Sequence, residues 1–415
     1  MLVLAHGVGG RRDLPIPFSL TLVAGVLVVA VSFVALGVLW RQPRFDRFGG
    51  RPLPLVLQRF LDARGFRYAL QLIGLVLTAS VAIIAIFGPD DTSNPAPGFV
   101  YVLFWVGIVP ASLVFGPVWR QLNPLRTMVR GWRGFATLPA WVGYWPAVAG
   151  LLAFTWLELV SPTRASTHTI VVFFACYGAA QLIGALVFGV RWFDRCDGFE
   201  AYSTVVGSLA PVGRRPDGRL VVRNPFNGLA GLESAPGLVA LVSTMFGATV
   251  YDSFSHAQFW VSAQKATGLS GIVTGTGGLV GTIAAVGLSY TVATRLCGML
   301  GDVPALPQRF AHSIVPIAVG YVGAHYFSLF VFEGGHTIAL AANSGGSVDY
   351  TLLAPALIAI VQVTGVVIGH VLGVVAAHDR AIGLFGHAAA VIGQLPLTLL
   401  MVGYTFTGLY LLFSG

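Results

Sequence analysis

The chain has 415 residues, of which 56% are hydrophobic and only 10% are charged. A soluble domain carries about a quarter charged residues, so this composition excludes a soluble globular protein, and 12% aromatic residues exclude a disordered chain. The net charge of +8 comes from arginines that lie between apolar runs. That pattern favours orientation in a membrane over binding of nucleic acid, so we expect the lipid bilayer as a partner and no nucleic acid.

The first residues of the chain allow two interpretations. Residues 2–5 are apolar but too few for the core of a signal peptide. They are either the end of a longer signal sequence that is cleaved after Ala5, or a short leader before a first membrane span that directs insertion by itself. Cleavage would make His6 the first residue of the mature protein.

Ten apolar segments are long enough to cross the roughly 30 Å of hydrocarbon in a bilayer. They are residues 18–40, 68–88, 98–119, 136–158, 169–190, 236–252, 270–294, 310–332, 352–376 and 390–413. The sequence therefore predicts an all-α, polytopic helical membrane protein in which residues 1–415 form a single integral membrane domain. The seventh segment contains Gly271, Gly275, Gly277, Gly278 and Gly281, which predict either a broken helix or close packing by small residues.

The arginines predict the orientation of these spans. Twenty of the 24 basic residues fall in the alternate connections 41–67, 120–133, 191–223, 295–309 and 377–389, and the other four are Arg11, Arg12, Arg164 and Lys265. Connections rich in Lys and Arg stay in the cytoplasm. We therefore expect a protein of the cell membrane with cytoplasmic basic connections and, for ten spans, both termini outside.

The longest cytoplasmic connection, residues 191–235, contains its own structural signal. Pro216-Asp217-Gly218 is a turn sequence, and Leu220-Val221-Val222 follows it as a β-branched apolar run. A turn residue cluster before such a run predicts a small β-hairpin.

Ionisable residues within or at the ends of spans are the default functional candidates in a membrane protein, because burying them is costly. On the predicted outer side the candidates are Glu158, Asp252, His256, His325, Glu333 and His336. His325 lies among apolar neighbours and needs a partner, so we expect an acid or a metal ion to hold it, with Asp252 or Glu158 the favoured acid. Glu158 and Asp252 are also the candidate catalytic carboxylates.

The spacing of the outer residues is typical of metal ligands. Asp252 and His256 are four apart on one helix face, and Glu333 and His336 have the spacing used in carboxylate-bridged metal sites of helical bundles. Imidazole and carboxylate ligands suit Zn, Fe, Mn or Cu. We therefore expect a divalent ion on Asp252, His256, His325, Glu333 and His336. The sixth and eighth spans must then be neighbours. The alternative is a ring of interfacial polar residues without an ion. We also expect the two glycines before His336 to end its helix.

Three stretches resemble one bacterial family, the multi-pass membrane proteins known as fenitrothion hydrolases. They are His6-Gly7-Val8-Gly9-Gly10 with Asp13-Leu14-Pro15-Ile16-Pro17, Arg214-Arg215-Pro216-Asp217-Gly218-Arg219-Leu220 with Arg223-Asn224-Pro225, and Ala311-His312-Ser313-Ile314-Val315-Pro316 running to His325-Tyr326-Phe327. The resemblance spans the whole chain. In that family a signal sequence usually precedes the first stretch, and the five-residue stub here departs from this pattern.

The resemblance implies hydrolysis of an apolar organophosphate triester with release of a nitrophenol. A metal ion that activates water would serve that reaction, and an apolar small-molecule substrate would enter from the bilayer. Two alternatives remain open at this stage. One is a transporter, and the other is a metal- or copper-handling protein without hydrolytic activity, with His6 as a copper ligand.

Overall fold

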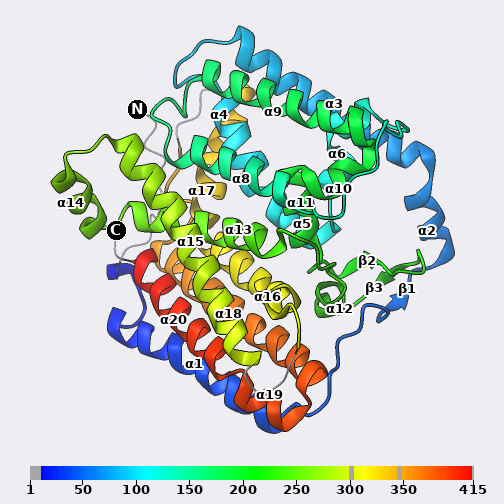
Figure 1. Cartoon of the computed structure of the whole chain (residues 1–415). Helices are drawn as coiled ribbons and strands as arrows, with labels where there is room; N and C mark the ends of the chain where they lie inside the picture. Colours follow the sequence, from blue (N-terminus) through cyan, green and yellow to red (C-terminus); the bar gives the residue numbers. More distant parts are fainter. Residues whose placement is uncertain (1–10, 299–302, 344–347, 414–415) are drawn as a thin grey trace.

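The computed structural model describes residues 11–298, 303–343 and 348–413, and its regular secondary structure is almost entirely helical (Figure 1). The predicted all-α fold is confirmed. Residues 1–10, on which both interpretations of the N-terminus depend, lie outside the described residues.

Nine helical stretches in the described part of the chain are long and apolar enough to cross a membrane. They are α1 (Phe18–Leu39), α3 (Arg64–Phe87), α4–η2–α5 (Ala96–Phe115), α9 (Thr167–Phe188), α13 (Leu238–Ser255), α15 (Gly271–Cys297), α16–η5–α17 (Leu306–Ala341), α18 (Pro355–Phe385) and α20 (Leu395–Leu412). The remaining predicted segment contains α8 (Trp145–Leu159). Its 15 residues extend about 22 Å, less than the roughly 30 Å of hydrocarbon in a bilayer.

Shorter elements connect the long helices. They are η1 (Arg11–Asp13), α2 (Leu55–Asp62), α6 (Trp119–Leu122), α7 (Pro124–Met128), η3 (Val190–Trp192), α10 (Phe193–Cys196), α11 (Gly198–Gly207), α12 (Pro225–Ala230), α14 (Gln258–Thr267) and α19 (His387–Gly393). Within the third span η2 (Phe99–Val106) is a wide π-helical stretch, a feature often found near functional sites. The third span continues as α5 (Ile108–Phe115), and η5 (Ala311–Ser313) leads into α17 (Ile314–Ala341).

The centre of the molecule is formed by α13 and the α16–α17 stretch. In these two spans 72% and 67% of the apolar window is buried, against 22% for α1 and 11% for α3. Helices α13 and α17 pack side by side, as predicted for the sixth and eighth spans, and α17 also packs along α18. The approach to α18 is close because glycines meet there. A Cβ on Gly320 would lie 2.5 Å from the carbonyl oxygen of Gly365.

The glycine-rich seventh segment forms one unbroken helix, α15, from Gly271 to Cys297. The expectation of a broken helix is therefore wrong, and the interpretation as close packing is confirmed for Gly275 and Gly278, whereas Gly271, Gly277 and Gly281 face open space. A Cβ on Gly278 would lie 2.6 Å from Cε2 of Tyr251 and 2.7 Å from Cζ2 of Trp260. Glycine lets α15 approach these aromatic rings, and the packing offsets its low helix propensity.

The predicted hairpin is present and carries an additional strand. β2 (Val212–Arg214) and β3 (Leu220–Val222) pair antiparallel, with Gly213 opposite Val221. β1 (Arg51–Pro52), which the sequence pattern did not indicate, pairs with the other edge of β3. The sheet order is β1-β3-β2, so this small sheet joins the connection after α1 to the connection before α13 (Figure 1).

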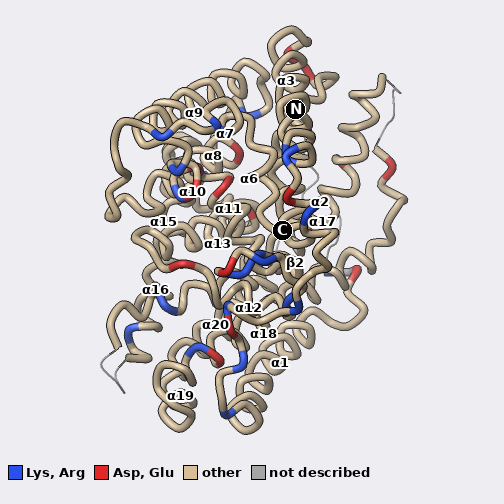
Figure 2. Tube along the Cα trace, turned by 90° about the vertical axis from the view of Figure 1, so that its right-hand side faces the viewer, with Lys and Arg blue, Asp and Glu red and all other residues tan. Residues whose placement is uncertain are grey.

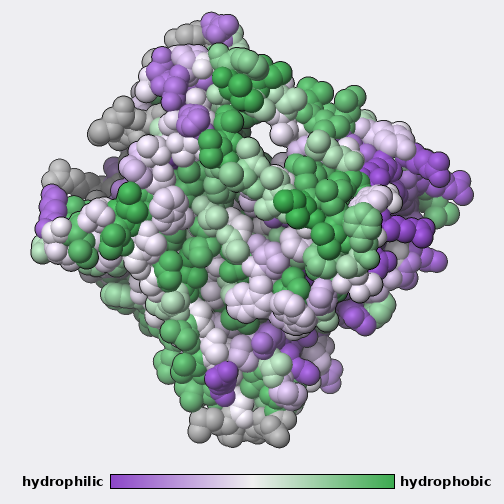
Figure 3. Space-filling view, turned by 45° about the horizontal axis from the view of Figure 1, so that its top comes forward, coloured by the Kyte–Doolittle hydropathy of each residue, from purple (hydrophilic) through white to green (hydrophobic). Residues whose placement is uncertain are grey.

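The arginine-rich connections contact one another, as their predicted common side requires. β1 and β3 join two of them, and Arg120 forms an ion pair with Asp194 at 2.9 Å. Most of the chain is free of charge (Figure 2). In the space-filling view the largest group of hydrophilic residues lies on the side where α2 and the sheet lie, smaller groups lie elsewhere on the edge, and apolar residues cover much of the helices (Figure 3).

Candidate active site

A buried hydrogen-bonded pair joins the two central helices. Nε2 of His325 on α17 lies 2.9 Å from Oδ2 of Asp252 on α13, and the two side chains are only 8% and 2% exposed. A histidine and an acid inside membrane spans are costly unless they pair, and here each is the partner of the other. The prediction that an acid holds His325, with Asp252 among the favoured partners, is confirmed.

The pair belongs to a longer chain of hydrogen bonds. The Tyr321 hydroxyl donates to Oγ of Ser253 at 2.9 Å, and this Oγ lies 3.1 Å from Nδ1 of His325. The Tyr326 hydroxyl donates to Oδ2 of Asp252 at 2.8 Å. Because Ser253 accepts from Tyr321, its own hydrogen is available for Nδ1, and the imidazole proton then sits on Nε2 and faces Asp252. We call these five residues the relay.

The order serine, histidine, carboxylate is the arrangement that activates a serine nucleophile. The nucleophile lies within hydrogen-bond reach of a base, and a third group orients the base. In the relay the two ring nitrogens of His325 have exchanged roles, since Nδ1 faces the serine and Nε2 faces the acid. Both nitrogens of imidazole accept a proton, so the exchange preserves the chemistry.

His256 lies next to the relay but is used differently. Its Nδ1 lies 2.8 Å from the backbone oxygen of Asp252 and 3.9 Å from the carboxylate oxygen Oδ1. The side chain is 53% exposed. The i,i+4 spacing therefore brings His256 to the backbone of Asp252 at the end of α13, and its ring caps that helix end.

Glu158, Glu333 and His336 line a small pocket of about 60 Å³, and Glu158 interacts electrostatically with Asp252 and Tyr326 of the relay. Nδ1 of His336 is 3.7 Å from Oε2 of Glu333, and the Tyr350 hydroxyl is 3.4 Å from Oε1 of Glu333. Oε2 of Glu158 is buried and has no hydrogen-bond partner. Tyr101 of the π-helical stretch η2 lines the same pocket. We call this cavity the rim pocket.

The glycines before His336 do not end the helix, because α17 continues to Ala341. The expectation of a helix end there is wrong, and tertiary packing explains the difference. Gly334 faces η2, and a Cβ added to it would lie 3.4 Å from Cδ2 of Leu103 and 3.8 Å from Cγ1 of Val102. The Thr337 hydroxyl donates to the backbone oxygen of Glu333 at 2.7 Å. His336 is consequently fixed one helical turn beyond Glu333.

The predicted five-ligand metal site divides into two parts. Asp252 and His325 are bonded to each other in the relay, whereas Glu333 and His336 belong to the rim pocket. Across the described residues no three His, Cys, Asp or Glu side chains lie close enough to share a metal ion. The relay does not fit a metal ion, since its oxygen and nitrogen atoms face hydrogen-bond partners. The rim pocket is lined by an unpartnered carboxylate oxygen, a second carboxylate and an imidazole, but in their present positions these three groups are too far apart to hold an ion together.

Three residues of the relay were missed by sequence reasoning, namely Ser253, Tyr321 and Tyr326. A usable signal exists, since Ser253 follows Asp252 directly and Tyr321 lies one helical turn before His325. A polar residue one turn from a buried histidine shares its helix face. Serine and tyrosine are common in membrane helices, so this signal alone does not identify a reactive group.

Comparison with known proteins adds no family assignment. No protein-family model, curated protein or solved structure matches the chain.

Proposed function

We propose that the protein is a membrane-embedded hydrolase that acts on an apolar ester or phosphoester. The observation that carries this proposal is the Ser253–His325–Asp252 order within the relay, with distances of 3.1 and 2.9 Å. The resemblance to fenitrothion hydrolases points to the same class of reaction. We further propose that the basic connections are cytoplasmic, which places the relay and the rim pocket in the outer half of the cell membrane.

The reaction begins when Oγ of Ser253 bonds to the carbonyl carbon or phosphorus of the substrate. Its proton passes to Nδ1 of His325, and the Asp252 carboxylate stabilises the imidazolium that results. The leaving alcohol or phenol takes that proton from His325 as its bond to carbon or phosphorus breaks. A water molecule then attacks the serine ester, gives its proton to His325, and releases the acid while Ser253 regains its hydrogen.

The surroundings of the relay select for an apolar substrate. Both central helices are enclosed by other apolar spans, and a substrate that dissolves in the bilayer reaches such a site laterally. Only 5% of Ser253 is exposed, so entry of a substrate requires local opening, as with the mobile loops of many enzymes.

A divalent ion, if the protein binds one, would find its donors at the rim pocket. Glu158, Glu333 and His336 all line it, and oxygen with imidazole nitrogen suits Zn, Fe or Mn. Such an ion would polarise a carbonyl or phosphoryl oxygen. To share one ion, these side chains have to rotate from their present positions.

Hydrolysis by purified variants tests the proposal. The substrates are a nitrophenyl carboxylic ester and a nitrophenyl phosphotriester, both supplied in mixed micelles. Ser253→Ala and His325→Ala should each lower kcat/KM by roughly 10³-fold, because loss of either group removes the same step. His168→Ala, which removes an exposed histidine, is the matched control and should retain full turnover.

Elemental analysis of the same preparations separates the relay from the ion. Removal of a bound ion should follow Glu333→Gln or His336→Ala and not Ser253→Ala. Equal turnover in the wild type, Ser253→Ala and His325→Ala would refute hydrolysis by the relay, whatever the metal content.

A transporter is the second candidate, and one observation favours it. Oε1 of Gln362 and Nε2 of His370, both buried in α18, have no hydrogen-bond partner. Unpartnered polar groups inside a span are costly and mark solute or proton paths in transporters. Flux into liposomes that falls in Gln362→Leu, with no hydrolysis by the wild type, would favour this function. The copper-handling alternative depends on His6, which lies outside the described residues.

A further inference from the structure

A second cavity lies at the opposite end of the bundle from the rim pocket, among the arginine-rich connections. Its volume is about 310 Å³. Four separate parts of the chain form its walls: residues 43–47 after α1, residues 226–230 of α12, His312 of η5, and residues 376–384 of α18. A cavity of this size is at the lower end of the range for small-ligand sites. We call it the basic cavity.

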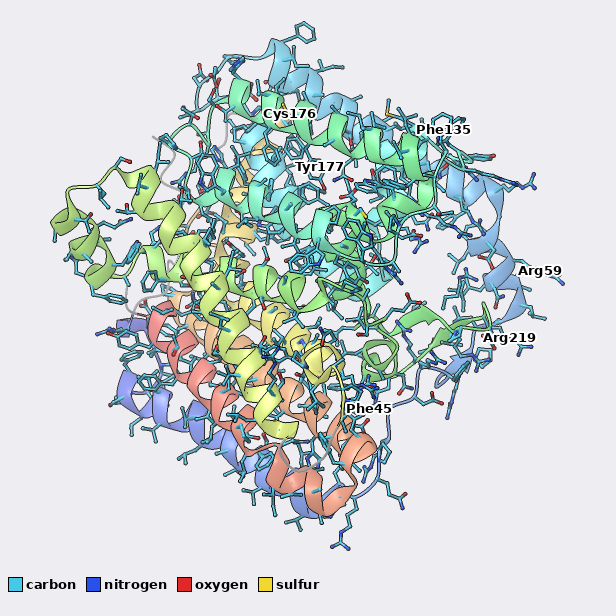
Figure 4. All side chains as sticks on the ribbon, in the orientation of Figure 1. Phe45, Arg59, Phe135, Cys176, Tyr177 and Arg219 are labelled. Carbon is cyan, nitrogen blue, oxygen red and sulfur yellow. The ribbon has the colours of Figure 1, made fainter. Side chains whose placement is uncertain are left out.

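The walls of the basic cavity are fixed by contacts of their own. Asp379 accepts hydrogen bonds from Nε1 of Trp40 at 3.0 Å and from the backbone N–H groups of Arg44 and Phe45 at 2.6 and 3.3 Å. The Phe45 ring stacks on Phe226, with centroids 4.6 Å apart. Phe45 lies between the end of α1 and the rest of the bundle (Figure 4). The cavity is therefore preformed, and both oxygens of Asp379 have N–H partners.

Two guanidinium groups in the lining lack a carboxylate partner. Arg47 and Arg380 take part in no salt bridge of the described residues. The side chain of Arg380 is partly buried and forms one hydrogen bond there, to the backbone oxygen of Ala230 at 3.2 Å. A guanidinium has five N–H donors, so most donors of Arg380 remain available. Asp46, the other acid of the lining, is exposed and accepts from the N–H of Phe48.

We propose that the basic cavity binds a phosphate group, carried by a phospholipid headgroup or by a soluble phosphate compound. Guanidinium groups bind phosphate oxygens in a bidentate manner, and Arg47 and Arg380 approach the cavity from different parts of the chain. Leu229 and Leu384 give the lining an apolar part that suits the glycerol and first methylenes of a lipid. The site is independent of hydrolysis by the relay.

Native mass spectrometry of the full chain tests the proposal. The detergent-solubilised protein is mixed with phosphatidylglycerol, or with diacylglycerol, which lacks the phosphate. Thermal unfolding with inorganic phosphate, against chloride at equal ionic strength, forms the second arm. Arg380→Gln and Arg47→Gln should each weaken retention of phosphatidylglycerol, or the shift in Tm with phosphate, by about tenfold in apparent affinity, the effect of one charge-assisted hydrogen bond. Arg219→Gln, an exposed arginine on the hairpin (Figure 4), is the matched control.

The outcomes distinguish a lipid phosphate from a soluble phosphate and show when neither binds. An effect confined to phosphatidylglycerol assigns the phosphate to a lipid, and an effect confined to inorganic phosphate assigns it to a solute. If Arg380→Gln does not fold, binding by Arg47→Gln and Arg380→Lys tests the proposal instead. Arg380→Lys keeps the positive charge but loses the bidentate donors of the guanidinium group. Retention and Tm shifts equal to those of Arg219→Gln in these variants would overturn the proposal, as would equal retention of diacylglycerol.

Discussion

Two clusters of buried polar side chains lie in different parts of the molecule, and the buried acids of each cluster have a different kind of partner. In the relay, Asp252 faces a histidine and a tyrosine. In the second cluster, which we call the arginine cluster, Arg126 binds Oε1 of the fully buried Glu200 at 2.7 Å and Oδ1 of Asp194 at 2.9 Å.

The arginine cluster also fixes the start of two helices. Asn123 caps α7 by accepting from the N–H groups of Leu125 and Arg126. Asp197 caps α11 and accepts from Nδ2 of Asn123 at 2.7 Å. Each carboxylate in the cluster therefore accepts hydrogen bonds from fixed donors or pairs with a permanent cation.

The comparison shows that the partner of a buried acid determines whether the acid can take part in proton transfer or only stabilises the fold. An arginine keeps its proton at any physiological pH, so the arginine cluster holds elements in place and does not exchange protons with a substrate. The relay has no permanent cation among its five members, and a ring nitrogen of its histidine can accept the proton of the Ser253 hydroxyl. Chemistry is therefore expected in the relay, and stability from the arginine cluster.

The largest effect is expected from Asp252→Asn. The amide presents an N–H group where the carboxylate accepted one, which favours the wrong tautomer of His325, and kcat/KM for nitrophenyl ester hydrolysis should fall by about 10³- to 10⁴-fold. Asp197→Asn is the counterpart in the arginine cluster. Asp197→Asn should leave turnover per folded molecule unchanged. A similar fall of kcat/KM in both variants would contradict the division between a reactive relay and a structural arginine cluster.

Arg126→Met should have the next largest effect, on stability. It leaves Glu200 buried without its cation, and removal of one partner of a buried ion pair costs about 3–5 kcal/mol. Chemical unfolding in detergent micelles at pH 9, above the pKa of about 8 that Glu200 has beside Arg126, measures this loss. Arg219→Met at an exposed position should change the free energy of unfolding by less than about 0.5 kcal/mol. Equal free energies for the two variants would contradict a structural role for the cluster.

Glu200, in the non-spanning helix α11, should make stability depend on pH. Burial raises its pKa from 4.5 to about 8, and Arg126 opposes this shift. Between these two values the folded chain keeps a proton that the unfolded chain has lost, so stability should fall as the pH rises from about 4.5 to 8.

The comparison of Glu200→Gln with the wild type measures this dependence. The variant should show a smaller decrease of Tm between pH 5 and pH 8 than the wild type. Burial also raises the pKa of Asp197, so some decrease should persist in the variant. Parallel pH profiles for the two proteins would refute the role of Glu200.

The smallest effects are expected from a matched pair of tyrosines, each of which donates to a buried aspartate. Tyr326 binds Asp252 at 2.8 Å, and Tyr177 binds Asp197 at 2.7 Å. Tyr326→Phe should lower hydrolysis by about tenfold, since one hydrogen bond to a charged acceptor is lost. Tyr177→Phe should lower stability by about 1–3 kcal/mol and leave hydrolysis intact. Activity and unfolding assays on both variants check this. Loss of hydrolysis in Tyr177→Phe with intact hydrolysis in Tyr326→Phe would contradict the comparison.

Much of the fold follows from the sequence because its signals are local. Apolar length located nine spans in the described part of the chain, whereas the predicted segment 136–158 contains only the shorter helix α8. The Pro216-Asp217-Gly218 turn located the hairpin. The strand β1 was missed because its two residues acquire their pairing only from β3, which is distant in the chain. The end of α17 was misplaced because packing of Gly334 against η2 overrides the propensity of glycine.

The candidate site was predictable only in part. His325 needed an acid because it is a histidine inside an apolar span, and Asp252 was among the few acids at the right depth. The separation of Glu333 and His336 from that pair depends on how α8, η2 and α17 enclose the rim pocket. Helical spacing defines which residues share a face but contains no information on which faces meet across three helices.

The three-stranded sheet has a consequence for the order in which the protein is made. β1 leaves the ribosome long before its partner β3, and the spans from α3 to α9 are synthesised between them. Until β3 arrives, the adjacent helix α2 lacks this anchor, and Leu55, Val56 and Phe60 are largely exposed even in the finished fold. The nascent chain therefore has to keep this amphipathic helix, which also carries Arg59 and Asp62, at the membrane surface through several insertion steps before the sheet closes.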